Sequence, residues 1–388
     1  MERGAHRKPL SIALACLAFL ACAFNSSSGQ SRGSKSGGEK VIKDITWRID
    51  SMLPGACKGQ AQAVLGESIV GVGGAEPGRR ASDTAWLLNT QTMQYTILPR
   101  APVILSYPQG ASVGEDFYLF TGSMRQSDSG SFEKWSNRMF RLSQGTGNWK
   151  WATLPALGLG RLFPGCAVSG SMIVVIGGET GPGSAETATV EAFDTRAAKL
   201  GWSSLPDFPG RARESMAVAA IGEKVYVFGG MSWSAGEVLR FAEAYALDLS
   251  RRTWTRLPNL PFPAFGWEGV VYRNRYIVMA GGIKGPSSDS APNFEVLVFD
   301  TRNSGYTILP TRIPPYQVRP ERYIQWLRPA LLNQVRLSGM DPDQGVYRHG
   351  PELSLVGDKV YLCGGEVISP DLNITCEVLI GTILEATS

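Results

Sequence analysis

The sequence predicts an all-β fold, a six-bladed β-propeller, from three observations. A short apolar run that ends in glycine, in most copies Gly-Gly, occurs six times: SIVGVGG, FYLFTGS, MIVVIGG, VYVFGG, YIVMAGG and VYLCGG. A tight turn and a second short apolar run precede each copy, so each copy is expected to close a β-hairpin. An aromatic residue followed by Leu-Pro also recurs six times: WRIDSMLP, YTILP, WKWATLP, GWSSLP, WTRLP and a second YTILP.

These repeats fit units of four strands: the hairpin, a third strand after a polar loop, and a fourth strand that carries the aromatic residue and Leu-Pro. Four short strands at a period of roughly 50 residues are typical of a propeller blade, whose faces are buried only against neighbouring blades. The first aromatic segment, Trp47–Pro54, precedes every hairpin, whereas the last strand, NITCEVLIGTIL, has no fourth strand after it. The N-terminal strand is therefore predicted to join the last blade and close the ring.

The first residues of the chain predict export. Basic residues at the start precede an apolar stretch from Leu10 to Phe24, and Ala21-Cys22-Ala23 offers small residues for cleavage; this is the pattern of a secretory signal peptide, which would cover 1–23. The stretch is shorter than the roughly 20 residues that a membrane-spanning helix needs. We expect a periplasmic or extracellular protein without a transmembrane segment. Because Cys22 follows Phe-Leu-Ala, a loose match to a lipobox, a lipid anchor at Cys22 is the alternative.

The remaining chain divides into a Ser/Gly-rich flexible linker over 24–44 and one propeller domain over 45–388. Within the propeller, an insertion at about 311–345 separates a Leu-Pro segment from the last hairpin. This insertion is interpreted either as a lid over one face of the ring or as filler over an exposed blade.

Charge and cysteine content limit the classes of partner. A formal net charge of +4 over 388 residues gives no footprint for nucleic acid. Four cysteines follow the signal peptide without a CxxC pair: Cys57, Cys166, Cys363 and Cys376. We therefore expect no zinc or other metal site and no cofactor. Cys363 and Cys376 would lie on successive strands and are the candidate disulfide in an oxidising compartment; buried free thiols are the alternative.

One face of the ring supplies the candidate site, because the loop after the second strand and the link into the next blade emerge on the same face. Arginine stands nine positions before the hairpin glycine in three blades, at Arg161, Arg213 and Arg348. Glutamate follows Gly-Gly directly at Glu179 and Glu366. The mouth of the ring is thus predicted to be lined by arginine and glutamate.

The same face is expected to carry four further candidates: Glu76, Arg80, Trp233 and Trp267. The two tryptophans are interpreted as stacking surfaces for a sugar ring or, alternatively, as packing between blades.

Two interpretations of the arginines stay open. Guanidinium groups that converge on the mouth would bind an anion such as a carboxylate through their planar fork. Alternatively, Arg161 with Glu179 and Arg348 with Glu366 would form ion pairs within their own blades. Arg213 fits this second interpretation less well, because no glutamate follows Gly230 directly.

Several chemistries are disfavoured. His349 is the only histidine after the signal peptide, which argues against a copper site with several histidine ligands. Ser-His-Asp catalysis would depend on the same histidine, and no GxSxG turn is present. Acid–base chemistry by carboxylates beside arginines remains.

Gly-Gly at the end of a second strand, followed by a spaced aromatic residue, resembles the kelch repeat over about residues 45–384. Within that family, VVIGGETGPG and VGVGGAEPGRR look like stretches of the bacterial N-acetylneuraminate mutarotases (epimerases), whose GExKPGxR motif pairs a glutamate with an arginine. The resemblance places the glutamate at Glu179, but Ala185 stands where the arginine would be. In the first blade the PGxR half survives up to Arg80, while Gly74 replaces the glutamate.

The sequence therefore supports two function classes. The first is an exported kelch module that binds a carbohydrate, another anionic ligand or a protein at the Arg/Glu-lined mouth. The alternative is a sialic acid mutarotase, in which Glu179 or Glu366 moves the proton and an arginine holds the substrate carboxylate. Because the motif is split between two blades, the first class is favoured. A purely structural role in an envelope assembly is a third interpretation.

Overall fold

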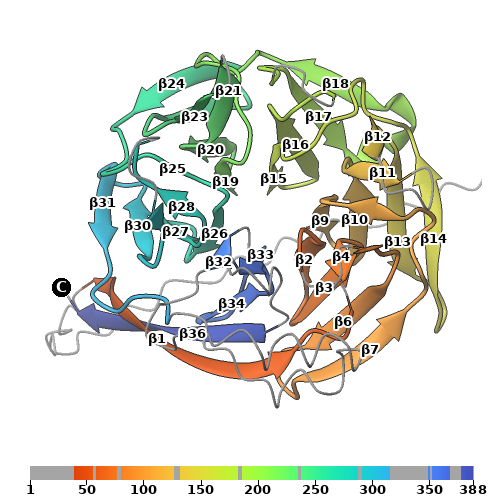
Figure 1. Ribbon diagram of the computed structural model, residues 1–388, viewed down its shortest axis with the longest axis horizontal. Coiled ribbons are helices and arrows are strands. Elements are labelled where there is room, and N and C mark those ends of the chain that lie inside the picture. The colour runs from red at the N-terminus through yellow and green to blue at the C-terminus, as the bar shows by residue number, and fades with distance from the viewer. Residues whose placement is uncertain are drawn as a thin grey trace, which may run out of the picture.

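The computed structural model describes residues 39–55, 58–76, 80–125, 132–181, 186–234, 237–286, 291–314, 348–349, 352–367 and 377–387. Within these residues, six four-stranded antiparallel sheets stand like blades around a central axis (Figure 1). The prediction of a six-bladed, all-β propeller is confirmed.

The first five blades are each formed by consecutive core strands, ordered from the axis outward. Blade 1 contains β2 (Ala61–Leu65), β3 (Ser68–Val72), β6 (Ala85–Asn89) and β7 (Gln94–Leu98). Blade 2 contains β9 (Gln109–Val113), β10 (Asp116–Phe120), β13 (Met139–Gln144) and β14 (Trp149–Leu154). Blade 3 contains β15 (Gly165–Ser169), β16 (Met172–Ile176), β17 (Val190–Asp194) and β18 (Trp202–Leu205), with the 3-10 helix η1 (Thr195–Leu200) before β18. Blade 4 contains β19 (Ala217–Ile221), β20 (Lys224–Phe228), β23 (Ala244–Asp248) and β24 (Thr253–Leu257); blade 5 contains β26 (Glu268–Tyr272), β27 (Tyr276–Ala280), β30 (Leu297–Asp300) and β31 (Gly305–Ile308).

Blade 6 joins the two ends of the described chain. Its strands are β33 (Glu352–Val356), β34 (Lys359–Cys363), β36 (Glu377–Thr387) and, outermost, β1 (Lys40–Met52). β1 pairs with β36 in antiparallel register, from Lys40 opposite Thr387 to Met52 opposite Glu377. The predicted closure by the N-terminal strand is confirmed. This strand begins at Lys40, within the expected linker, because β36 extends far enough to pair with it.

The core is divided among the junctions between blades. The innermost strands of successive blades contact one another in an unbroken cycle, β2, β9, β15, β19, β26, β33 and back to β2. Between them, aromatic and aliphatic side chains pack from one blade onto the next. The Phe228 ring of blade 4, for example, lies with its centroid 5.2 Å from that of Phe299 in blade 5. No blade buries its apolar faces without its neighbours, which makes the closed ring the stable unit.

The repeated aromatic and Leu-Pro motif ties the rims of the blades together. The indole Nε1 of Trp254 in blade 4 donates to the Pro206 carbonyl of blade 3 at 3.0 Å, and the Tyr306 hydroxyl of blade 5 donates to the Pro258 carbonyl of blade 4 at 2.8 Å. Equivalent bonds join Trp151 to Pro99 and Trp202 to Pro155. The aromatic residue and the Leu-Pro recur together because each bond between blades needs an aromatic donor and a proline carbonyl.

The second glycine of each Gly-Gly pair is required by conformation and by space. Gly178 and Gly230 both have φ of 97°, a backbone conformation that residues with a Cβ rarely adopt. A Cβ at Gly178 would also lie 2.8 Å from the Leu162 carbonyl oxygen, and a Cβ at Gly230 would lie 2.5 Å from Met216 Cγ. The chain at these glycines passes directly against the segment that leads into the innermost strand.

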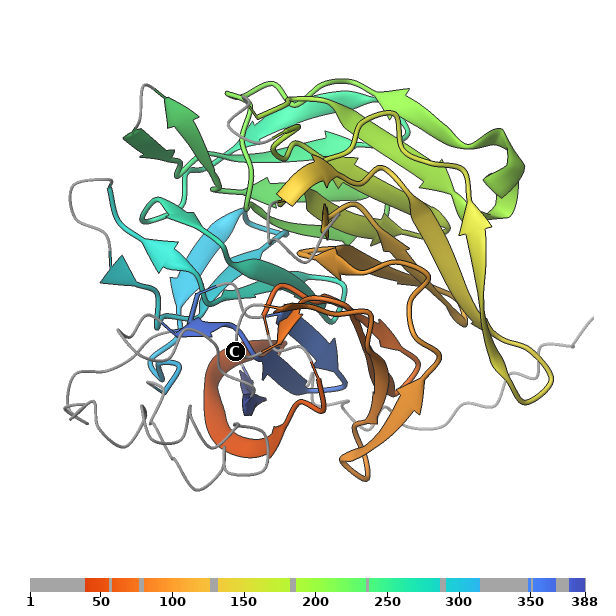
Figure 2. The same ribbon diagram turned by 45° about the vertical axis from the view of Figure 1, so that its right-hand side comes forward.

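Short two- and three-stranded ladders lie beyond the four-stranded sheets, formed by segments before and after the repeated glycines. Their strands are β4 (Ala75–Glu76), β5 (Arg80–Ala81), β8 (Leu105–Ser106), β11 (Ser123–Arg125), β12 (Phe132–Trp135), β21 (Met231–Ser234), β22 (Glu237–Arg240), β25 (Ala264–Phe265), β28 (Ile283–Lys284), β29 (Ala291–Pro292), β32 (Arg348–His349) and β35 (Glu366–Val367). Figure 2 shows the green β21–β22 hairpin and the teal β28–β29 segment standing out on the same side of the ring. This side is the face on which the sequence predicted the mouth.

Several sequence-based expectations fall outside the described residues: the signal peptide over 1–23, most of the linker over 24–44 and most of the insertion at 311–345. Cys363 is buried on β34, whereas Cys57 and Cys376 also lie outside the described residues, so the candidate disulfide stays a prediction. In the part of the chain that the structure describes, no helix has the length and apolar character needed to cross a membrane.

Candidate functional site

In blades 1 to 5, the segment that leads into the innermost strand carries one residue with a left-handed backbone. The described examples are Gly59, Tyr107, Phe163, Ser215 and Gly266, with φ between 53° and 63°. Backbone N–H groups of these residues bond across blades: Tyr107 donates to Gly59 and Ser215 donates to Phe163, both at 2.9 Å. For a residue other than glycine, this left-handed backbone conformation costs about 1–2 kcal/mol. Strain of this kind is concentrated at functional sites.

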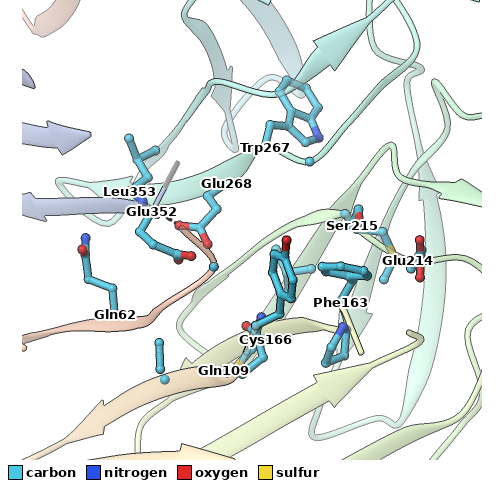
Figure 3. A pocket seen from close by; sticks show the side chains of 18 of the residues that line it. Gln62, Gln109, Phe163, Cys166, Glu214, Ser215, Trp267, Glu268, Glu352 and Leu353 are labelled. Carbon is cyan, nitrogen blue, oxygen red and sulfur yellow. Dashed lines mark hydrogen bonds between the residues drawn. The ribbon is translucent and has the colours of Figure 1, made fainter. Parts of the chain in front are cut away.

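These lead-in segments and the first residues of the innermost strands enclose a cavity of about 400 Å³, to which all six blades contribute. Figure 3 shows several of the lining side chains. The rings of Tyr107 and Phe163 lie edge to face with centroids 4.9 Å apart. Among the described lining residues, three are glutamates (Glu214, Glu268, Glu352) and only Lys58 is basic. The described lining of this cavity contains no arginine, and the Arg/Glu lining predicted for the mouth of the ring stays a prediction.

Glu268 of β26 and Glu352 of β33 lie side by side in the cavity (Figure 3). A hydrogen bond joins their carboxyl groups, and the Leu353 N–H donates to Glu268 Oε2 at 2.7 Å. Burial and the neighbouring Glu268 charge raise the pKa of Glu352 well above its usual range, because two carboxylates this close do not both ionise. The described residues contain no group of three or more His, Cys, Asp or Glu that could hold a metal ion, at this pair or elsewhere.

Glu214 is the third acidic residue of the lining and precedes β19. Its backbone pairs with Met231, N–H to carbonyl in both directions at 2.9 Å, and the residue is 2% exposed. Burial, and then the charges of Glu179 and Glu186, raise the pKa of Glu214 from 4.5 to about 8. Glu214 is therefore protonated at neutral pH.

This raised pKa makes stability depend on pH. Folded Glu214 keeps its proton up to about pH 8, whereas the unfolded side chain loses it near pH 4.5, so the stability from this group is lost as pH rises through that range. Glu214→Gln cannot ionise and should gain free energy of unfolding relative to wild type between about pH 5 and pH 8, by roughly 1.4 kcal/mol per unit of pKa shift. Urea unfolding at about pH 5 and pH 8 measures this difference in the free energy of unfolding. Glu115→Gln, in an exposed hairpin turn, should keep the wild-type pH dependence; identical pH profiles for both variants would contradict the prediction.

Three buried polar atoms of the lining have no hydrogen-bond partner among the described residues: Gln60 Oε1, Glu214 Oε2 and Trp267 Nε1. The three residues are between 1% and 2% exposed. A buried polar atom without a partner costs about 1–3 kcal/mol, and native proteins contain few of them. The lining thus presents hydrogen-bond donors and acceptors to a molecule in the cavity.

Arg161 and Arg213, both predicted to bind ligand, lie inside the blades that surround the cavity. Their side chains are 0% and 1% exposed. Arg161 pairs with Glu191 and donates to the Gly177 carbonyl at 3.0 Å. Its acidic partner is thus Glu191 in place of the expected Glu179.

Arg213 has an equivalent arrangement in blade 4. It pairs with Glu243 at 2.9 Å and donates to the Gly229 carbonyl at 3.1 Å. The guanidinium also lies 3.8 Å from the Phe241 ring centroid. The structure does not bring these two arginines together as an anion clamp, because each is enclosed in its own blade with a carboxylate and a Gly-Gly carbonyl.

Glu179, Trp233 and Trp267 lie on or near the cavity. Glu179 forms bridges with Leu162 and Glu186, and its charge acts on Glu214. Trp233 of β21 is 56% exposed at the rim, and its N–H donates to Glu186 Oε1 at 2.7 Å. Trp267 is 1% exposed, packs in the junction between blades 4 and 5, and lines the cavity. Their predicted roles in catalysis and binding stay predictions.

The other candidates are placed through their backbone alone. Glu76 of β4 lies opposite Arg80 of β5. Arg348 of β32 lies opposite Val367 of β35, one position along from Glu366. Their side chains lie outside the described part of the structure, so their predicted roles also stay predictions.

Sequence reasoning missed the three acids of the cavity. Glu268 and Glu352 are each the first residue of an innermost strand, five positions ahead of the hairpin turn, and Glu214 precedes such a strand. A charged residue at a position that is Ala61 or Ala217 in other blades was the available signal. This charged residue pointed to the central cavity because the first strand of a blade lies nearest the axis.

Comparisons with known proteins agree with this architecture. The family model of the KLHDC2/KLHL20/DRC7 Kelch-repeats domain matches residues 109–323, more than half of the chain. The chain is 24% identical over 286 residues to Kelch-like protein terF of Aspergillus terreus, covering 70% of this chain and 60% of that protein. It is also 30% identical over 160 residues to human Kelch-like protein 34, covering 39% of this chain and 24% of that protein.

A shorter match relates the chain to an enzyme. It is 32% identical over 95 residues to the N-acetylneuraminate epimerase of Yersinia enterocolitica, with 24% of each chain covered. The chain therefore spans less than two thirds of the length of each of these relatives. The sequence-based resemblance to kelch proteins is confirmed, together with a distant similarity to N-acetylneuraminate epimerases. With the family model over more than half of its length and six blades in a closed ring, the chain belongs to the kelch-repeat family of β-propellers.

Proposed function

We propose that this protein is a binding module that takes a carbohydrate without negative charge into its central cavity. The observation that carries the proposal is the composition of the lining, where a carboxyl pair and glutamines face two aromatic rings. Sugar hydroxyls would donate to Glu268 and Glu352, while the apolar face of a sugar ring would pack on Tyr107 and Phe163. A cavity of about 400 Å³ lies within the size range of small-molecule sites.

The charge of the lining separates this ligand class from the anionic ligands that the sequence suggested. Three glutamates and one lysine line the described cavity, and the guanidiniums of Arg161 and Arg213 are occupied by Glu191 and Glu243. A ligand carboxylate would therefore lie beside several carboxyl groups without a described arginine to pair with. This charge balance supports a neutral or cationic sugar.

Replacing one member of the carboxyl pair tests the proposal. Glu352→Gln replaces one of the two acceptor oxygens with an NH2 donor and leaves the Leu353 N–H bond to Glu268 in place. We expect the affinity for the best neutral oligosaccharide of a glycan array to fall about tenfold or more, because leaving a buried hydrogen-bonding group without its partner costs about 1–3 kcal/mol. Isothermal titration calorimetry of the purified protein measures it.

Glu115→Gln is the matched control, since it makes the same chemical change in an exposed turn between β9 and β10. It should leave the affinity unchanged. Equal affinities for wild type and Glu352→Gln, or preferential binding of sialylated glycans, would remove the basis of the proposal.

A second candidate function is sialic acid mutarotation. The match to N-acetylneuraminate epimerase and the position of Glu179 beside protonated Glu214 support it, because mutarotation needs one group to accept a proton and another to donate one. The acidic lining opposes it, since sialic acid is an anion.

NMR of free sialic acid separates the two functions. A mutarotase should accelerate the exchange of anomers over buffer and lose most of this acceleration in Glu179→Gln. Exchange at the buffer rate would eliminate the enzyme and leave the binding module.

We also propose that the protein acts outside the cytoplasm. The basic start, the apolar stretch over 10–24 and the small residues around Cys22 support this location. N-terminal sequencing of the mature protein checks it: cleavage near Ala23 is expected for a free secreted form, and a lipid-modified Cys22 for an anchored one.

A further inference from the structure

We infer that the side of the cavity formed by blades 3 and 4 is a subsite for a protonated amine, so that the carbohydrate is an amino sugar held through its ammonium group by Glu214. This inference rests on the proposed function and names its ligand class. It is carried by one buried acceptor that lacks a partner and by the charges that surround it.

The acceptor is Glu214 Oε2. It lines the cavity and has no hydrogen-bond partner among the described residues, although Glu214 is 2% exposed. Figure 3 shows its carboxyl group on the side of the cavity next to Ser215 and Phe163, across from Glu268 and Glu352. A buried carboxyl oxygen of this kind is stabilised most by a charged donor, and an ammonium group carries three N–H donors and no acceptor.

The surrounding charges favour a cation at the same place. The nearby charges that act on Glu214 are those of Glu179 and Glu186, both negative. Glu179 and Glu186 bridge to each other through their backbones, and Glu186 Oε1 accepts the Trp233 N–H at 2.7 Å. Together the three glutamates form an acidic group at the edge of the cavity between blades 3 and 4.

Two basic residues near Glu214, Arg213 in the sequence and Lys58 in the cavity lining, have other contacts. Arg213 is adjacent in sequence, but its guanidinium is enclosed with Glu243 and the Gly229 carbonyl. Lys58 lies in blade 1, with its Nζ 5.5 Å from the Tyr107 ring centroid. A bound ammonium would therefore favour the ionised form of Glu214, satisfy its Oε2 and offset the negative charges of Glu179 and Glu186, whereas an acetamido group offers one N–H donor and no positive charge.

The test compares two sugars of equal length that differ in charge. Isothermal titration calorimetry at pH 6, where the amines are protonated, would use a trimer of glucosamine and a trimer of N-acetylglucosamine. Wild type should bind the glucosamine trimer at least tenfold more tightly. Glu214→Gln should reduce this preference to about threefold or less, and Glu115→Gln should preserve it.

The outcomes distinguish the inference from the proposed function. If the N-acetylated trimer binds as tightly as the glucosamine trimer, or more tightly, the amine subsite is wrong and carbohydrate binding stands. If neither trimer nor any neutral glycan binds, the proposed function fails first. If spermidine binds as tightly as the glucosamine trimer, the sugar part of the inference is overturned. Circular dichroism checks that Glu214→Gln is folded; if it is not, Glu186→Gln at the rim should lower the preference instead.

Discussion

A chain that starts at Leu53 should lose the cooperative unfolding transition of the propeller and associate in solution. Without β1, blade 6 lacks its outermost strand, and the paired edge of β36 from Glu377 to Thr387 becomes exposed. Ile45, fully buried, leaves the core shared with β34, β36 and blade 5. Loss of a large buried side chain alone costs about 2–5 kcal/mol, and a whole domain is stable by only about 5–15 kcal/mol.

Thermal unfolding followed by circular dichroism, together with gel filtration, measures this effect. A chain that starts at Glu39 is the matched control and should unfold at the wild-type temperature. A synthetic peptide of residues 39–55 should restore the transition to the shortened chain by pairing with β36. If the two chains unfold at the same temperature, β1 does not close the ring in solution.

Arg213→Leu should lower the free energy of unfolding by about 1.5–3 kcal/mol, because hydrogen bonds that involve charged groups contribute about that much and the Glu243 side chain, 33% exposed, keeps part of its hydration. The substitution removes the partner of Glu243 and the donor to the Gly229 carbonyl. It also removes the stacked guanidinium on Phe241. Urea denaturation at neutral pH measures the change.

Arg211→Leu is the control, since Arg211 is two residues away and exposed; its effect should stay within about 0.5 kcal/mol. The double variant Arg213→Leu, Glu243→Leu should recover part of the loss, because neither charge is then left unpaired. A loss below about 1 kcal/mol for Arg213→Leu would show that the arginine is available for another role, such as binding a ligand.

The ring could be predicted from sequence because each blade repeats the same local requirements. The Gly-Gly pair is set by a left-handed backbone and by a close approach, as at Gly178 and Gly230. The aromatic residue and Leu-Pro recur because each bond between blades, such as Trp254 to Pro206, uses both. The closure of the ring could be predicted by counting fourth strands, because one precedes the first hairpin and none follows the last.

The roles of the site residues could not be predicted in the same way, although the partners of the two arginines keep a constant spacing. Arg161 and Arg213 stand at equivalent positions, and Glu191 and Glu243 each follow their arginine by 30 residues. A spacing rule that considers only the residue after Gly-Gly finds the arginines and misses both carboxylates. It also leaves open whether a long side chain turns toward the axis or back into its own blade, and both turn back.

The cavity acids were harder still to predict, since they occupy a position with no repeated residue. The first residue of the innermost strand is Ala61, Gln109, Gly165 and Ala217 in blades 1 to 4, and only then glutamate. Irregularity at one position of a regular repeat is where a site differs from its scaffold.

The partnership of β1 with β36 has a consequence for the order of synthesis. The ribosome makes Lys40–Met52 before any blade and Glu377–Thr387 after all the others, so the two strands are the farthest apart in time of any that pair. Throughout translation β1 has no partner strand, and the ring cannot close until β36 has been made. Chaperones that hold the nascent chain would therefore find their longest-lived target in this one strand.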